Sequence, residues 1–158
     1  MTTHCAAVHR PAGLWPKDKA ADVLTLDFDS RHRRRIRLTT DRGEDVLLNL
    51  RKAVAMAVGD GLQLDDQRWL RVEAAPETLI EVRHKDPHRL VCLAWHLGNW
   101  HLPTEFRDQA LRIRPDDTIE DMLHELGADL ATIRAPFQPA GGAYNGYRHR
   151  QTHDDHHR

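Results

Sequence analysis

The spacing of apolar residues changes at Pro76, and this change predicts two regions with different folds. Before Pro76, apolar residues recur at every second position in short stretches, which is typical of half-buried strands. The predicted strands lie at residues 23–28, 35–40, 46–50, 62–64 and 69–73. The connections between them are short, so we expect a small all-β domain over residues 1–75.

After Pro76, strand spacing alternates with helical spacing. The predicted elements are a strand at 78–83, a helix at 87–99, strands at 102–106 and 110–113, a helix at 117–126 and a strand at 129–133. Asp86-Pro87 favours the start of the first helix, and Asp117 with Glu120 resembles a capping box for the second. The order β-α-β-β-α-β is that of a ferredoxin-like domain, which we expect over residues 76–140. The predicted fold class is therefore α+β.

Residues 141–158 are too polar to bury themselves, and we expect a disordered tail there. Four of its side chains are histidines, at His149, His153, His156 and His157. Imidazole binds nickel, copper and zinc, and a flexible histidine cluster can surround an ion without a prior geometry. A solvated polar terminus or an expression tag is the alternative, although an unbroken six-histidine run is absent.

Composition excludes several classes of protein. With 23 Lys and Arg against 24 Asp and Glu, the formal net charge is -1, so we expect no nucleic-acid partner and no attraction to anionic lipid. The longest apolar run, residues 53–58, is far shorter than the roughly 20 residues of a membrane span. No secretory signal pattern is visible, and two cysteines define no disulfide framework. We therefore expect a cytoplasmic, reduced protein, with Cys92 in the apolar stripe of the first helix and hence in the core.

No catalytic motif is complete in this sequence. His124-Glu125 begins an H-E-x-x-H pattern, but Ala128 occupies the second histidine position. The basic run 31–35 could contact phosphate, although a solvated turn is the favoured interpretation and the aromatic RNA-binding pattern is missing. Because nothing assembles a nucleophile, a base and an orienting group, we expect a protein that is not an enzyme.

Two histidines lie on either side of the predicted end of the first helix, His96 and His101. Gly98-Asn99, which tolerate positive φ, are expected to end the helix between them. We expect His96 to form a hydrogen bond on the helix, whereas the spacing leaves His101 open between metal ligand and loop residue. His84 could join from the neighbouring strand end. One histidine cannot hold an ion tightly, but a twofold dimer would place two copies side by side.

The same segment, Trp95-His96-Leu97-Gly98-Asn99-Trp100-His101-Leu102-Pro103, resembles the YHLGNRHxP segment of the UreE family of urease accessory proteins. Asp121-Met122-Leu123, Pro136-Phe137-Gln138-Pro139 with Gly141-Gly142-Ala143-Tyr144, and the histidine-containing tail agree with this resemblance. It extends from about Leu24 to the end of the sequence. It implies a homodimeric nickel metallochaperone with an N-terminal β domain that engages a partner protein and a C-terminal ferredoxin-like domain that binds metal and dimerises.

The resemblance also implies roles for individual residues. His101 from both subunits would meet at the dimer interface and bind one Ni²⁺, and the tail histidines would supply further ligands. The ion would pass to the accessory GTPase UreG and then to the urease apoprotein. Two positions depart from the family: Trp100 replaces an arginine, and the tail is short and sparse in histidine.

The ligands alone do not select nickel, because an imidazole site normally prefers Cu²⁺ and binds Zn²⁺ comparably. A general nickel, copper or zinc storage or sensing protein without a urease partner is therefore the alternative function. An adaptor that binds RNA or a partner through the basic run at 31–35 is a third possibility.

Overall fold

The structure is a computed structural model that describes residues 3–141, and the chain divides into two compact units, residues 1–77 and 78–158. The predicted tail histidines, His149, His153, His156 and His157, lie outside the described residues. In the described part of the chain, no helix has the length and apolar character needed to cross a membrane.

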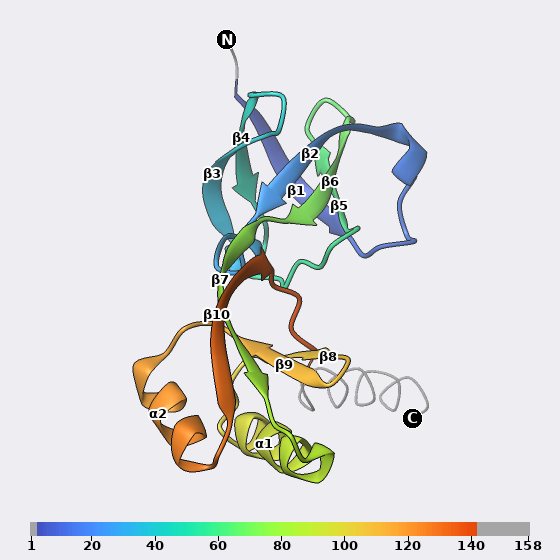
Figure 1. The fold of residues 1–158 in the computed structure, drawn as a ribbon. Helices are drawn as coiled ribbons and strands as arrows, with labels where there is room; N and C mark the ends of the chain where they lie inside the picture. Colours follow the sequence, from blue (N-terminus) through green and yellow to red (C-terminus); the bar gives the residue numbers. More distant parts are fainter. Residues whose placement is uncertain (1–2, 142–158) are drawn as a thin grey trace, which may run out of the picture. The chain divides into compact units, whose positions relative to one another are not determined.

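The first unit is a curled sheet of six strands with two short 3-10 turns (Figure 1). Its elements are β1 (His4–Arg10), η1 (Lys17–Lys19), β2 (Ala20–Leu26), η2 (Ser30–His32), β3 (Arg35–Thr39), β4 (Asp45–Asn49), β5 (Gly61–Leu64) and β6 (Trp69–Ala74). The strand order is β2-β6-β5-β1-β4-β3. The alternating apolar residues of these strands meet in one core, whose fully buried members include Leu24, Val46, Leu48, Leu62, Leu70 and Val72. The all-β prediction for this region is confirmed.

Strand β1, which lies inside the sheet, is not among the strands predicted from the sequence. β1 pairs in parallel with β4 and antiparallel with β5, so both of its edges are hydrogen-bonded. Its buried apolar residue is only an alanine, Ala6, which is 1% exposed. Because the strand is held by backbone pairing on both sides and not by large buried side chains, its sequence shows little alternation.

The second unit contains four strands and two helices in the predicted order β-α-β-β-α-β (Figure 1). They are β7 (Pro76–Arg83), α1 (Pro87–Asn99), β8 (Glu105–Arg107), β9 (Ala110–Ile113), α2 (Asp117–Glu125) and β10 (Asp129–Pro136). The strand order is β10-β7-β9-β8, and β9 pairs antiparallel with β7 and with β8. Both helices contribute to one core with β7 and β9, which includes Ile80, Val82, Leu93, Leu97, Leu111, Ile113 and Leu123. The chain as a whole is thus α+β.

Both helices begin where the sequence predicts, but the capping residue of α2 differs by one. The Asp86 side chain accepts the backbone N–H of His88 at 2.9 Å, as a capping residue does. At α2 the cap is Asp116 and not Asp117: its Oδ1 accepts the N–H of Ile119, and Glu120 Oε2 accepts the N–H of Asp116. The reciprocal cap therefore spans the five residues from Asp116 to Glu120 and starts one residue before the predicted position.

Two further predictions for this unit were wrong in detail. Strand β8 begins at Glu105 and not at residue 102, since Pro103 has no N–H to donate and the Thr104 hydroxyl donates to the Leu102 carbonyl in a local turn. Cys92 is exposed and not in the core. Leu93 and Leu97 face the core, and Cys92 is rotated about 100° from Leu93 on a helix of 3.6 residues per turn.

We expect Gly61→Ala to destabilise the first unit by about 1–3 kcal/mol, because a Cβ at Gly61 would overlap the ring of buried Trp15. That ring is held in place by stacking on Trp69 and by a hydrogen bond from its Nε1 to the Gly59 carbonyl. Urea unfolding measures the change. Gly98→Ala is the control, since its Cβ meets nothing within 4 Å on α1 and no loss of stability is expected. Equal midpoints for Gly61→Ala and the parent would contradict this packing.

Candidate metal centre

His101 lies in a tight turn that follows helix α1. The backbone N–H groups of Trp100 and His101 donate to His96 and Gly98, and the N–H of Leu102 donates back to the Leu97 carbonyl at 3.1 Å. These bonds hold His101 at φ 57°, a left-handed conformation that costs a residue with a side chain roughly 1–2 kcal/mol. The helix ends at Asn99 as expected, but the positive φ falls on His101 and not on Gly98 or Asn99. The turn leaves His101 exposed.

His96 has a packing role. Its ring centroid lies 5.3 Å from that of Trp95, edge-on, and 5.6 Å from that of Trp100. Trp100 itself is half-buried against the core of the second unit. The tryptophan that replaces the arginine of the UreE pattern therefore packs beneath the turn to His101, and His96 contacts aromatic rings where the sequence predicted a hydrogen bond.

His84 also has a local role. Its Nδ1 accepts the backbone N–H of Asp86 at 2.9 Å, in the turn from β7 to α1. Among residues 3–141, it forms no group of three potential metal ligands with His96 or His101. Over residues 3–141, then, the predicted ligand His101 has no two further histidine, cysteine or carboxylate ligands within reach in its own chain.

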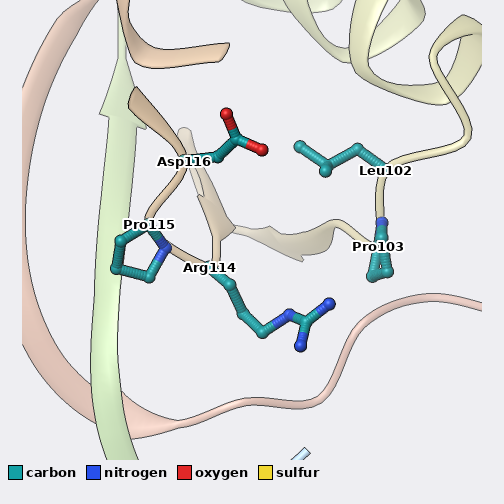
Figure 2. A pocket seen from close by; sticks show the side chains of 5 residues that line it. All are labelled: Leu102, Pro103, Arg114, Pro115 and Asp116. Carbon is teal, nitrogen blue, oxygen red and sulfur yellow. The ribbon is translucent and has the colours of Figure 1, made fainter. Parts of the chain in front are cut away.

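A hollow lies next to the turn, between the residues that follow His101 and those that precede α2 (Figure 2). It is lined by Leu102, Pro103, Arg114, Pro115 and Asp116. The Asp116 carboxylate already caps α2 through the Ile119 N–H, so it is held in place by the helix that it starts. The hollow thus combines apolar walls with one acidic and one basic side chain.

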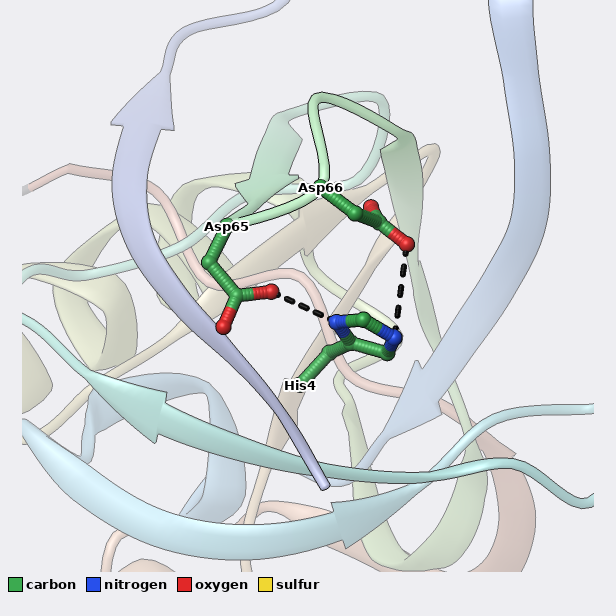
Figure 3. A group of neighbouring side chains, drawn as sticks. All are labelled: His4, Asp65 and Asp66. Carbon is green, nitrogen blue, oxygen red and sulfur yellow. Dashed lines mark hydrogen bonds and ion pairs between the residues drawn. The ribbon is translucent and has the colours of Figure 1, made fainter. Parts of the chain in front are cut away.

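The first unit contains a group that the sequence analysis missed, formed by His4, Asp65 and Asp66 (Figure 3). His4 Nδ1 lies 2.6 Å from Asp65 Oδ1, and His4 Nε2 lies 3.5 Å from Asp66 Oδ2. Hydrogen bonds from His4 and from the Cys5 N–H lower the pKa of Asp65. About sixty residues separate the histidine from the carboxylates, and only the pairing of β1 with β5 brings them together. No sequence spacing signals such a group.

Arg68 makes this group a charge network and not an open metal cage. Its Nε donates to Asp66 Oδ2 at 2.6 Å, and its two terminal nitrogens donate to both oxygens of Glu44, at 2.9 and 2.6 Å. These bidentate bonds lower the pKa of Glu44. A divalent cation at Asp66 Oδ2 would meet the guanidinium charge already bound there, so the network is better suited to joining β1, the β3–β4 turn and the β5–β6 turn.

Comparison with known proteins identifies the chain. The sequence model of the UreE urease accessory protein, N-terminal domain, matches residues 2–75, and that of its C-terminal domain matches residues 77–158. The chain belongs to the UreE family. UreE proteins are named as accessory proteins of urease and not as enzymes, so the expectation that this chain is not an enzyme is confirmed.

Several curated relatives carry the name urease accessory protein UreE. The protein from Rhodopseudomonas palustris (strain HaA2) is 56% identical over 128 residues, which cover 81% of this chain and 60% of the relative. Those from Beijerinckia indica subsp. indica and Chelativorans sp. (strain BNC1) are 50% and 47% identical over 146 residues, covering 92% and 89% of this chain and 83% and 92% of the relatives. The chain thus spans about three fifths of the length of the Rhodopseudomonas UreE.

We expect Glu44→Gln to lower stability at pH 7 and to lower it less at pH 3. The folded-state pKa of Glu44 is depressed by Arg68, so the stabilisation exists above the unfolded pKa near 4.5 and is lost as pH falls through the folded value. Urea unfolding at both pH values measures this. Asp18→Asn, which removes an exposed carboxylate of η1, is the control and should have no such effect. An equal destabilisation by Glu44→Gln at pH 7 and pH 3 would show that the Arg68 pair is not its cause.

Proposed function

We propose that this UreE protein is a nickel metallochaperone that delivers Ni²⁺ for assembly of the urease active site. The observation that carries the proposal is His101: an exposed imidazole held by a left-handed turn at the end of α1, at the family's ligand position. Zn²⁺ or Cu²⁺ can bind the same ligand type, so the choice of nickel rests on the urease named by the relatives.

We further propose that the protein acts as a homodimer in which both copies of His101 bind one ion. Within residues 3–141 of one chain, no group of three potential ligands includes His101. A second copy of His101 and the tail histidines His149, His153, His156 and His157 would therefore complete the coordination. Val91 and Trp95 support the dimer, because they are 67% and 66% exposed, lie four residues apart on one face of α1 and form an exposed apolar patch of the kind that marks protein interfaces.

The two units receive separate roles in this proposal. Residues 1–75 would engage partner proteins, and residues 76–140 would form a ferredoxin-like domain for metal binding and dimerisation, with 141–158 as a ligand-bearing tail. The strand order β10-β7-β9-β8, with a helix between the members of each βαβ pair, supports the ferredoxin-like arrangement. The partners would be UreG and the urease apoprotein, in the cytoplasm.

The proposed site suits a carrier better than a store. An ion held by two interface imidazoles and by tail ligands can exchange its ligands one at a time, whereas a closed four-ligand cage retains its metal. A protein that binds nickel but transfers none to urease apoprotein would instead be the storage or sensing protein that the sequence left open.

We expect His101→Ala in the full chain to weaken binding of the first Ni²⁺ by at least about tenfold. Losing a residue that only hydrogen-bonds to a metal ligand already lowers metal affinity by about 10- to 100-fold, and His101 would be a ligand itself. Titration calorimetry measures the affinity and the number of ions per dimer. His124→Ala is the matched control, since His124 is an exposed histidine in the last turn of α2. If His101→Ala binds as tightly as the parent, the tail is the nickel store and the interface site is refuted.

We expect Trp95→Lys to shift the dimer towards monomer, because a charged side chain would be buried in the interface. Sedimentation velocity over a concentration series measures the change. Leu14→Lys places the same charge at a 69% exposed apolar residue of the first unit and should leave the dimer intact. A Trp95→Lys protein with an unchanged sedimentation coefficient would place the interface elsewhere.

A further inference from the structure

Helix α1 exposes a histidine and a cysteine, His88 and Cys92, on the side opposite its buried leucines. Both side chains are exposed, and Cys92 Sγ lies 4.0 Å from His88 Nε2. Residues four apart lie on the same face of a helix, so the helix itself places the two side chains next to each other. The core-facing residues Leu93 and Leu97 fix the rotation of the helix and place this pair on its exposed side, which also carries Trp95.

The pair has the chemistry and the separation of a metal chelate. Imidazole nitrogen and thiolate sulfur are both ligands of borderline divalent ions. Metal–nitrogen and metal–sulfur bonds are about 2.0–2.1 Å and 2.3 Å, so one ion reaches both atoms across any separation below about 4.4 Å. At 4.0 Å the two atoms are within that limit, and small side-chain rotations bring them to the about 3.5 Å that a tetrahedral ion requires.

The backbone beneath the pair is rigid. Pro87 occupies the first position of α1, and the Asp86 carboxylate caps the helix by accepting the N–H of His88 itself. Among residues 3–141, neither the His88 ring nor the Cys92 thiol has a hydrogen bond or ion pair other than their mutual contact. Binding an ion would therefore displace no existing cation, in contrast to the His4 group, where Arg68 already occupies a carboxylate oxygen.

We propose that His88 and Cys92 form a second metal site, a thiolate–imidazole chelate for Ni²⁺ or Zn²⁺ whose two protein ligands come from one chain. The site is separate from His101: Cys92 lies eight residues before Trp100, or roughly 12 Å along the helix axis. It differs from the His101 site in ligand type, because it includes a sulfur. The proposal does not depend on nickel binding by His101.

A thiolate signature tests the proposal, because Cys5 and Cys92 are the two cysteines of the chain. The full-length protein is kept reduced with a phosphine and titrated with Ni²⁺, and then with Co²⁺, while near-ultraviolet thiolate-to-metal charge-transfer absorption is recorded. We expect a band that saturates at one thiolate-bound ion per chain. Cys92→Ser should remove the band, and Cys5→Ser should leave it unchanged.

Two histidine variants test the second ligand. His88→Ala should raise the Ni²⁺ concentration at half-saturation of the band by at least about tenfold, whereas His124→Ala should not change it. Circular dichroism verifies that each variant is folded. The proposal is overturned if no band appears, if the band survives Cys92→Ser, or if His88→Ala titrates like the parent.

His101→Ala distinguishes this site from the proposed function. The band should persist in that variant with an unchanged midpoint, even though calorimetry loses the first nickel. If the band instead disappears with His101, the cysteine belongs to a single shared site and the separate chelate is refuted. If calorimetry is unchanged but the band persists, the interface proposal fails while the His88–Cys92 site stands.

Discussion

The rotation of helix α1 about its own axis is set by Leu93 and Leu97, which are buried against β7 and β9, and most of the candidate chemistry depends on it. Burying these leucines stabilises the second unit by roughly 1.5–3 kcal/mol each. Because these leucines face the core, the residues at the other positions of each helical turn point away from it. His88, Cys92 and Trp95 are therefore presented to solvent as a consequence of core packing, and the helix end delivers His101.

The two units use charge differently. In the first unit, Arg68 joins carboxylates from two separate parts of the chain, Glu44 and Asp66, and already binds the Asp66 oxygen that faces His4. In the second unit, imidazole and thiol groups are exposed along α1 and in the turn that follows it. Borderline metal ions favour such donors, and the absence of a competing bound cation is what separates a candidate ligand pair from a structural ion-pair network.

Periodicity predicted every strand that buries large side chains and both helices. It failed where the structure depends on long-range pairing or on helix phase. β1 is held by its neighbours β4 and β5, so Ala6 gives almost no signal. Cys92 was assigned to the core because it lies between apolar residues, but Leu93 and Leu97 define a phase that excludes it. The His4 group depends on a pairing across sixty residues, and His101 was singled out by resemblance, since its spacing was ambiguous.

The left-handed turn at His101 lowers the stability of the fold but presents the imidazole that would bind metal. Glycine adopts a φ of 57° without steric penalty, so glycine at this position would relax the turn by about 1 kcal/mol while removing the imidazole. Random substitution screened only for thermal stability would therefore drift towards losing this histidine. A more stable variant of this protein should therefore keep His101 and carry its stabilising substitutions in the first unit, away from the strained turn.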